Sequence, residues 1–142
     1  MTYIKTHGQE LENAYPYTAK DGTCKYVASS GKVKVQSVAS VTPNSVSQLK
    51  AAIAKGPTTV GVDASSVFSQ YKSGILNSAT CGTSPNHSVT AVGYGTSGTT
   101  DYYIVRNSWG SGWGMSGYIN IAAVPGAGVC GIQMFNVWPT TN

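Results

Sequence analysis

Charged side chains are scarce in this chain of 142 residues. Only 10% of the residues are Asp, Glu, Lys or Arg, whereas 41% are hydrophobic. Disordered chains have the opposite balance, with few apolar and many charged residues, so we expect this chain to fold. Its length is near the commonest domain size and is too short for two domains of typical size.

Long apolar runs and clusters of basic residues are also missing. No stretch approaches the roughly 20 apolar residues of a membrane helix, and the first ten residues lack the apolar region of a signal peptide. The nine Lys and Arg residues are spread from Lys5 to Arg106 and form no run that could follow a phosphate backbone. The sequence therefore predicts neither a membrane nor a nucleic acid as partner.

Two indications of cellular location conflict. A chain without a signal peptide normally stays in the cytosol, but low charge, frequent Ser, Thr and Tyr, and three cysteines are typical of a secreted or vacuolar protein. The conflict is a first indication that an N-terminal part is missing. Residues 3–7 are a second one, because they resemble the last turns of a helix ended by Gly8 and are too few to form a helix by themselves.

Seventeen glycines, with Ser and Thr in nearly every segment, favour short strands joined by many turns. Apolar residues at helical spacing predict one clear helix over residues 45–55, with Ser45 as its N-cap. The product we expect is a closed or half-closed antiparallel sheet. Its predicted strands cover residues 32–36, 58–63, 87–94, 102–106, 118–121 and 133–137.

The chain has two histidines and five carboxylates, so candidate acid–base groups are few. His7 lies beside Gly8 at a helix end, and we interpret it as a solvated surface group without a role. His87 opens a strand, where a ring can face a cleft. On this segment alone, a plain structural histidine is the preferred interpretation.

The segment from residue 102 to 121 changes that balance. It places Asn107 at the end of a strand, and Trp109 and Trp113 in a run of glycines. The two tryptophans either pack in the core or form the wall of a site. A general base needs a fixed tautomer, which the amide oxygen of an asparagine can impose by accepting the ring N–H.

Two segments carry a specific resemblance. Residues 86–95 read Asn-His-Ser-Val-Thr-Ala-Val-Gly-Tyr-Gly, and residues 107–114 read Asn-Ser-Trp-Gly-Ser-Gly-Trp-Gly. They resemble the His and Asn segments of papain-like cysteine proteases, the peptidase family that includes the lysosomal cathepsins. Further matches to the family are Tyr15-Pro16-Tyr17 before Cys24, Gly56-Pro57, Tyr71 to Ile75, and Cys130-Gly131-Ile132.

The resemblance implies an α+β fold. Residues 15–142 would form the mainly antiparallel, β-barrel-like right domain of the papain fold with a few short helices, and residues 1–14 would be a remnant of a helical left domain that is otherwise missing. The parent protein would hydrolyse peptide bonds through an acyl-thioester and would be lysosomal, vacuolar or secreted. No metal or organic cofactor is implied, because His87 has no second ligand at metal spacing.

The resemblance also assigns roles to individual residues. His87 would be the general base and acid, Asn107 its orienting residue, and Trp109 the shield over their hydrogen bond. Gly61, Pro85 and Phe135 would line the pocket for the second residue before the scissile bond. Phe135 is larger than the residue the family often has at its position, which implies a shallow pocket for compact apolar side chains. Asn86 would offer its backbone carbonyl to the substrate, and Trp113 would line the leaving-group side of the cleft.

None of the three cysteines matches the nucleophile of the family. That cysteine lies about 130 to 150 residues before the histidine and asparagine, and His87 is too near Met1 for this spacing. Cys81 and Cys130 match a family disulfide, whereas Cys24 matches a cysteine whose partner lies in the missing half. The chain alone would therefore lack both the nucleophile and the donors of the oxyanion hole.

Three interpretations remain open at this point. The chain is part of a cysteine endopeptidase acting on peptides or proteins, or a subunit completed by a separate chain that brings the cysteine half. Alternatively, it is a non-catalytic module that binds peptides or a partner. Retention of His87, Asn107 and Trp109 argues against the module, because an abandoned site need not keep all three.

Overall fold

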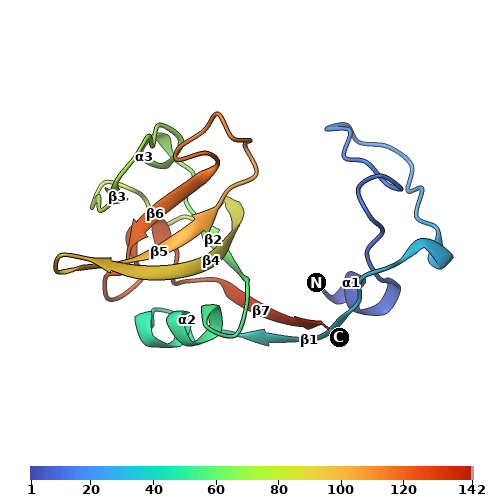
Figure 1. Cartoon of the computed structure of the whole chain (residues 1–142), viewed down its shortest axis with the longest axis horizontal. Helices are drawn as coiled ribbons and strands as arrows, with labels where there is room; N and C mark the ends of the chain where they lie inside the picture. Colours follow the sequence, from blue (N-terminus) through green and yellow to red (C-terminus); the bar gives the residue numbers. More distant parts are fainter. Residues whose placement is uncertain (142) are drawn as a thin grey trace. The chain divides into compact units, whose positions relative to one another are not determined.

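The computed structural model describes residues 1–141. The strands form one sheet in the order β1-β7-β2-β4-β5-β6-β3 (Figure 1). Strand β2 pairs antiparallel with β4 and β7, β5 pairs antiparallel with β4 and β6, and β3 pairs parallel with β6. The fold is therefore α+β with a mainly antiparallel sheet. Its elements are α1 (Thr2–His7), η1 (Ala28–Ser30), β1 (Val35–Ser40), α2 (Val46–Ile53), β2 (Thr58–Val62), α3 (Ser66–Ser69), β3 (Ile75–Leu76), β4 (His87–Ser97), β5 (Thr100–Arg106), β6 (Tyr118–Ala122), η2 (Val129–Gly131) and β7 (Asn136–Thr141).

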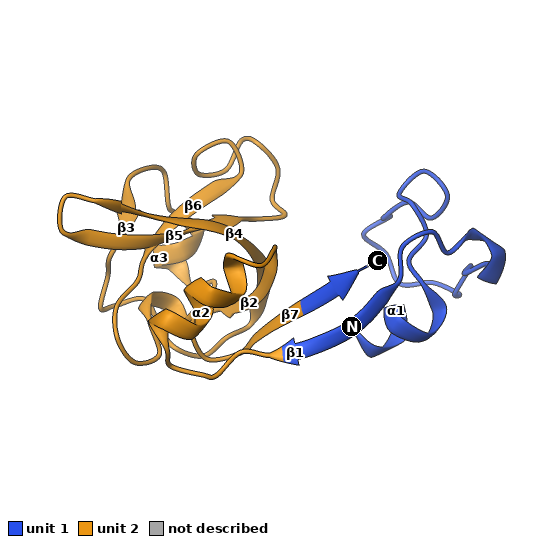
Figure 2. Cartoon of the chain, turned by 60° about the horizontal axis from the view of Figure 1, so that its bottom comes forward, with its two compact units in different colours: residues 1–39, 139–142 blue, residues 40–138 orange. Residues whose placement is uncertain are grey.

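Contacts divide the chain into two compact units, coloured separately in Figure 2. Unit 1 consists of residues 1–39 and the chain from Pro139 onward, and unit 2 of residues 40–138. The sequence-based boundary after residue 14 stays a prediction. Unit 1 buries a single hydrophobic side chain, Val35, among its described residues, and so has no hydrophobic core of its own. Its exposed large hydrophobic residues are Met1, Tyr3, Leu11, Tyr15, Tyr17, Val27, Val33 and Val38.

Unit 2 contains the hydrophobic core, to which both the sheet and the helices contribute. Helix α2 buries Leu49, Ala52 and Ile53, and its N-cap Ser45 accepts a hydrogen bond from the Gln48 N–H at 3.3 Å, as the sequence predicted. Burying a side chain the size of Leu49 or Ile53 contributes about 1.5–3 kcal/mol. The largest fully buried apolar side chains elsewhere in unit 2 are Val60, Val62, Phe68, Tyr103, Val105, Ile119, Ile121 and Ile132.

Four predicted strands are confirmed as β2, β4, β5 and β6, with small differences in their bounds. The strand predicted over residues 133–137 is displaced, since β7 begins at Asn136. The chain is still turning at Met134, whose N–H donates to the Gly131 carbonyl at 3.0 Å. The strand predicted over 32–36 begins only at Val35, because Val33 makes just an isolated bridge to Gln9.

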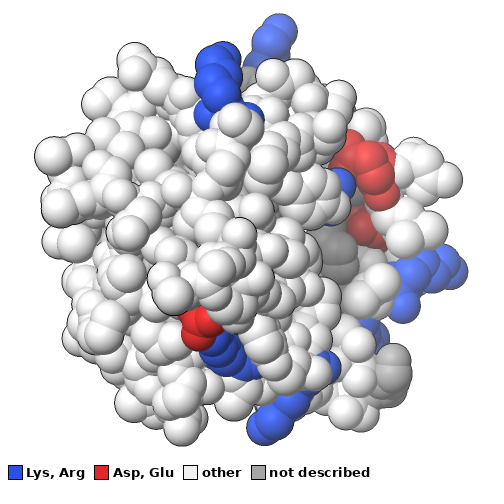
Figure 3. Space-filling model, turned by 60° about the vertical axis from the view of Figure 1, so that its left-hand side comes forward, with Lys and Arg blue, Asp and Glu red and all other residues white. Residues whose placement is uncertain are grey.

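Charged side chains are few and form no large patch of one sign. On the face drawn in Figure 3, Lys and Arg form small groups within a mostly uncharged surface. The only ion pair within residues 1–141 joins Lys50 Nζ and Asp101 Oδ2 at 2.5 Å. The Lys50 ammonium also lies 5.6 Å from the centre of the Tyr94 ring. Among the described helices, none has the length and apolar character needed to cross a membrane.

Candidate active site

The structure brings His87 and Asn107 into direct contact. His87 is the first residue of β4, and Asn107 directly follows β5. Because Thr90 pairs with Arg106 in the antiparallel ladder, the start of β4 and the end of β5 lie at the same end of the hairpin. His87 Nε2 lies 2.9 Å from Asn107 Oδ1. The predicted base and its predicted orienting residue therefore form a hydrogen-bonded pair.

The backbone N–H of Ser108 determines which ring nitrogen of His87 is basic. This N–H donates to Asn107 Oδ1 at 2.8 Å, which an amide nitrogen could not accept, so the atom facing His87 is an oxygen. An oxygen acceptor requires a proton on Nε2. The lone pair of the neutral imidazole is then on Nδ1, which no hydrogen bond within residues 1–141 occupies.

Asn107 and Trp109 confine the hydrogen bond from two directions. Asn107 is buried, and its backbone N–H donates to the Gly117 carbonyl at 2.9 Å, which fixes the start of the loop. Trp109 stacks on the His87 ring with centroids 5.0 Å apart and planes inclined by 24°. The indole covers one face of the imidazole, so water has restricted access to the hydrogen bond from that side.

An open depression of about 480 Å³ lies beside His87. Its lining includes Gly61, where a β carbon would lie 3.3 Å from the Pro85 β carbon and 3.5 Å from that of Phe135. Glycine therefore keeps this space open. Phe135 is 65% exposed, so its ring is available to a bound group. The lining residues are Gly61, Pro85, Asn86, His87, Ser88 and Phe135, which include four of the five predicted substrate-binding residues.

The disulfide pairing of the cysteines agrees with the one that the resemblance implied. Cys81 and Cys130 form a disulfide and are buried, and Cys24 is an exposed free thiol among the described residues. Within residues 1–141, no three His, Cys, Asp or Glu side chains are grouped so that they could hold a metal ion. The chemical groups of the site are therefore an oriented imidazole, an amide, aromatic rings and the adjoining depression.

Comparison with known proteins identifies the family. A sequence model described as papain family cysteine protease matches residues 1–140. The chain belongs to the papain family. It is 48% identical over 134 residues to a cathepsin L-like proteinase of Fasciola hepatica, covering 92% of this chain and 40% of that protein. It is 42% identical to papaya proteinase 4 of Carica papaya, covering 100% of this chain and 42% of that protein.

Solved papain-family structures agree with the fold. The bromelain protease of Ananas comosus has a TM-score of 0.90 at 40% identity, covering 99% of this chain and 67% of that one. Digestive procathepsin L 3 of Tenebrio molitor has a TM-score of 0.92 at 35% identity, covering 98% of this chain and 46% of that one. The sheet with few short helices is thus the right domain of the papain fold. This chain spans about two fifths of its curated relatives, matching their C-terminal portion.

Sequence reasoning missed one central residue of this papain-family site, Phe68. It is fully buried in α3 and packs edge-on against His87 at 6.3 Å and Trp109 at 5.7 Å between centroids. It also stacks on Trp113 at 5.2 Å. The four-residue helix that carries it is too short for a periodic pattern, so no sequence signal marked the residue.

Trp113 does not line the depression beside His87 and belongs to the aromatic cluster around Phe68. Its Nε1–H donates to the Ser69 carbonyl at 2.9 Å, which fixes the indole against α3. Tyr71 packs beneath it, at 5.8 Å between centroids. Burial raises the pKa of Tyr71, whose hydroxyl donates to the Gly74 carbonyl at 2.6 Å. Trp113 is therefore held against α3 and the aromatic cluster and is not part of the lining of the depression.

Proposed function

We propose that this chain supplies the histidine, the asparagine and one wall of the substrate site of a cysteine endopeptidase. The observation that carries the proposal is the orientation of His87, whose Nε2–H is held by Asn107 and whose Nδ1 is open. A cysteine protease needs this arrangement, in which a base of fixed tautomer accepts the thiol proton. Its substrates would be peptides or proteins, cleaved without a metal or an organic cofactor.

The proposed chemistry uses Nδ1 as the site of proton transfer. His87 takes the proton of the cysteine thiol, and the thiolate attacks the scissile carbonyl carbon. The imidazolium then gives its proton to the leaving amine, which leaves an acyl-thioester. In the second half, His87 removes a proton from water as it attacks the thioester, and returns the proton to the thiolate. Asn107 keeps the ring oriented throughout, and Trp109 limits access of water to the Nε2 hydrogen bond.

The nucleophilic cysteine is proposed to lie in the part of the parent protein that this chain does not include. Cys81 and Cys130 are unsuited to the role because they are buried and joined to each other. The lack of a core in unit 1 also supports a missing half, since its exposed apolar residues need a covering surface. As the resemblance implies, that half would be a helical domain to which residues 1–14 belong, and Cys24 would pair with one of its cysteines.

The depression beside His87 is proposed to receive an apolar side chain of the substrate, close to the scissile bond. Glycine at position 61 leaves room in its lining, and the large Phe135 beside it would make the pocket shallow, so compact apolar side chains would be favoured. Asn86 would offer its backbone carbonyl to the substrate. A lysosomal, vacuolar or secreted location is also proposed, which the Cys81–Cys130 disulfide supports.

Complementation tests the proposal directly. The purified chain is assayed with a dipeptidyl fluorogenic substrate, alone and mixed with the separately produced cysteine-bearing half of the Fasciola hepatica relative. Hydrolysis is expected only in the mixture. It should be abolished by His87→Ala and retained in His7→Ala, which removes the other histidine of the chain. Hydrolysis by the chain alone that is lost in His87→Ala would contradict the proposed origin of the nucleophile.

A non-catalytic module is the second candidate. The observation in its favour is that the depression and the aromatic cluster are formed by residues that include no cysteine. Such a module would bind a peptide without the cysteine half and would form no active complex with it. Isothermal calorimetry of the chain alone with the dipeptidyl substrate, together with the complementation assay, therefore separates the two candidates.

A further inference from the structure

A buried carboxylate next to the site has no part in the proposed mechanism. Asp63 directly follows β2 and is only 7% exposed. Its Oδ1 accepts the Ser65 N–H and its Oδ2 accepts the Ser84 N–H, both at 3.1 Å. Within residues 1–141 no basic side chain forms an ion pair with it. Burial of a carboxylate that only backbone N–H groups compensate is costly, which indicates a specific use.

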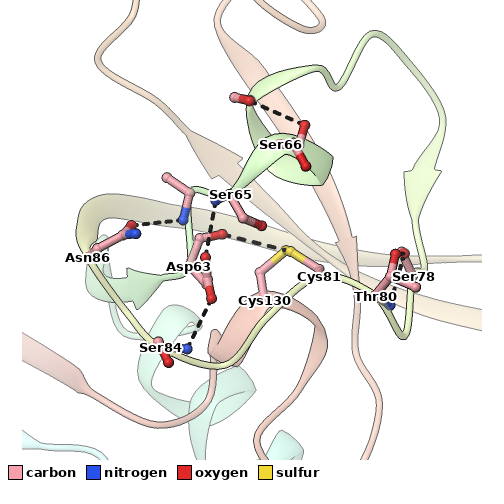
Figure 4. The surroundings of a disulfide bond; sticks show 11 residues. Asp63, Ser65, Ser66, Ser78, Thr80, Cys81, Ser84, Asn86 and Cys130 are labelled. Atoms are coloured by element: carbon pink, nitrogen blue, oxygen red, sulfur yellow. Dashed lines mark hydrogen bonds between the residues drawn. A yellow bond between two sulfur atoms is a disulfide. The ribbon is translucent and has the colours of Figure 1, made fainter.

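Asp63 connects three segments of the chain (Figure 4). Its own N–H donates to the Cys130 carbonyl at 2.8 Å, and its carbonyl oxygen lies 3.7 Å from Cys81 Sγ. The carboxylate holds Ser84, three residues beyond Cys81. Because Cys81 and Cys130 are joined by a disulfide, the loop from Cys81 to Ser84 is anchored at both of its ends.

This loop leads directly into His87. The N–H of Asn86 donates to the Val62 carbonyl at 3.1 Å, and its side-chain oxygen accepts the Ala64 N–H at 2.9 Å. Together with the carboxylate bond described above, three hydrogen bonds connect the end of β2 to the residues just before β4. They place Pro85 and Asn86 in the wall of the depression and determine where the His87 backbone enters the sheet.

Gly82 gives independent evidence for the importance of the carboxylate. Gly82 does not have a positive φ, so residues other than glycine could adopt its backbone conformation. A β carbon at this position would nevertheless lie 2.1 Å from Asp63 Oδ2 and 3.0 Å from Asp63 Cγ. The loop therefore needs glycine here to leave space for the carboxylate.

We infer that Asp63 is a positioning residue for His87. Its carboxylate, accommodated by Gly82, fixes the turn over residues 82–86 and through it the placement of the imidazole and of the depression wall. The inference rests on the proposed function of His87. A positioning role of Asp63 differs from a contribution to stability alone, because it requires that loss of the carboxylate has a local effect on the His87 ring.

The test compares Asp63→Asn with the unaltered full chain by NMR. Asparagine keeps the size of the side chain, but its NH2 group cannot accept, so one of the two N–H donors loses its partner. We expect whichever of the Ser84 and Ser65 amides loses its partner to exchange at least about tenfold faster relative to the β5 amides. We also expect the His87 ring resonances to shift. Asp101→Asn removes an exposed carboxylate elsewhere and should leave those resonances in place.

Equal acceleration of the Ser84, Ser65 and β5 amides, with unchanged His87 resonances, would overturn the inference, because Asp63 would then only stabilise the fold. If Asp63→Asn does not fold, Gly82→Ala replaces it, since the new methyl group must displace the carboxylate. Unchanged His87 resonances in folded Gly82→Ala would also overturn it, and Gly22→Ala, in open space, is the matched control. None of these signals depends on hydrolysis, so failure of the proposed peptidase activity is distinguished from failure of this inference.

Discussion

Removal of the Tyr103 hydroxyl is expected to destabilise the chain by about 1–3 kcal/mol, the cost of leaving a buried acceptor without a partner. Tyr103 and Gln133 are fully buried, and the hydroxyl donates to Gln133 Oε1 at 2.8 Å. Gln133 Nε2–H in turn donates to the Gly126 carbonyl at 2.6 Å. Tyr103→Phe keeps the ring but leaves Oε1 unsatisfied, because no solvent reaches it.

Urea unfolding at pH 7 measures the loss, with a decrease of about 2–4 °C in Tm for each kcal/mol as a second readout. The double variant Tyr103→Phe/Gln133→Met should lose less than the sum of the single losses, since the two side chains belong to one network. Additive losses, or a loss below about 0.5 kcal/mol for Tyr103→Phe, would show that the hydroxyl is not buried as the structure has it.

Alkaline pH gives an independent check on the same residue. Burial raises the pKa of Tyr103 above the value of 10.0 for a free tyrosine. Its neutral form is therefore favoured in the folded state, and this contribution to stability is complete below about pH 10 and is lost as the pH rises further. The difference in stability between the unaltered chain and Tyr103→Phe should accordingly shrink above about pH 10.

The remaining predictions concern stability, thiol chemistry and association. Phe68→Ala should cost about 3–5 kcal/mol in urea unfolding, as expected for a large side chain removed from a core, whereas Phe135→Ala, which truncates a mostly exposed ring, should cost little. Thiol labelling of the oxidised chain should modify Cys24 only, and modification of either disulfide cysteine would contradict the assigned pairing. The hydrogen bond from Lys50 lowers the pKa of Asp101, so this pair stabilises the fold above about pH 4 and its contribution is lost as the pH falls lower. Acid titrations of Asp101→Asn and the unaltered chain should therefore converge at low pH. Sedimentation velocity at micromolar concentration should show self-association that the cysteine-bearing half reverses, because the apolar residues of unit 1 are exposed, and a compact monomer would refute this.

The sequence predicted the parts of the site that lie within continuous segments. His87 opens β4 and Asn107 directly follows β5, and the sequences of both strands have strong β propensity. Because the two strands are consecutive in the chain, their pairing in one sheet could be expected, and this pairing brings the two residues together. Helix α2 was predictable because its eight residues carry both a cap and a periodic apolar face. Such features lie within a few consecutive residues, so the sequence alone reveals them.

Other parts depend on contacts that no local pattern records. Phe68 reaches His87 and Trp109 from a helix of four residues, where periodicity cannot be detected. The glycine at position 82 has an ordinary backbone conformation, and only the distant Asp63 explains its presence. The displaced start of β7 has the same cause, because the turn after Cys130 extends further than β-propensity suggests.

The Ser108 amide makes the orientation of His87 independent of any second chain. A backbone group one residue beyond Asn107 selects the tautomer of His87, so the selection is made entirely within this chain. Under the proposed function, a complementing thiol would not have to organise the base, because Nδ1 is already free to accept its proton. The half-site is in this sense modular. Cysteine-bearing halves from different relatives, or a thiol on a designed peptide that fits the depression, would meet the same preset imidazole.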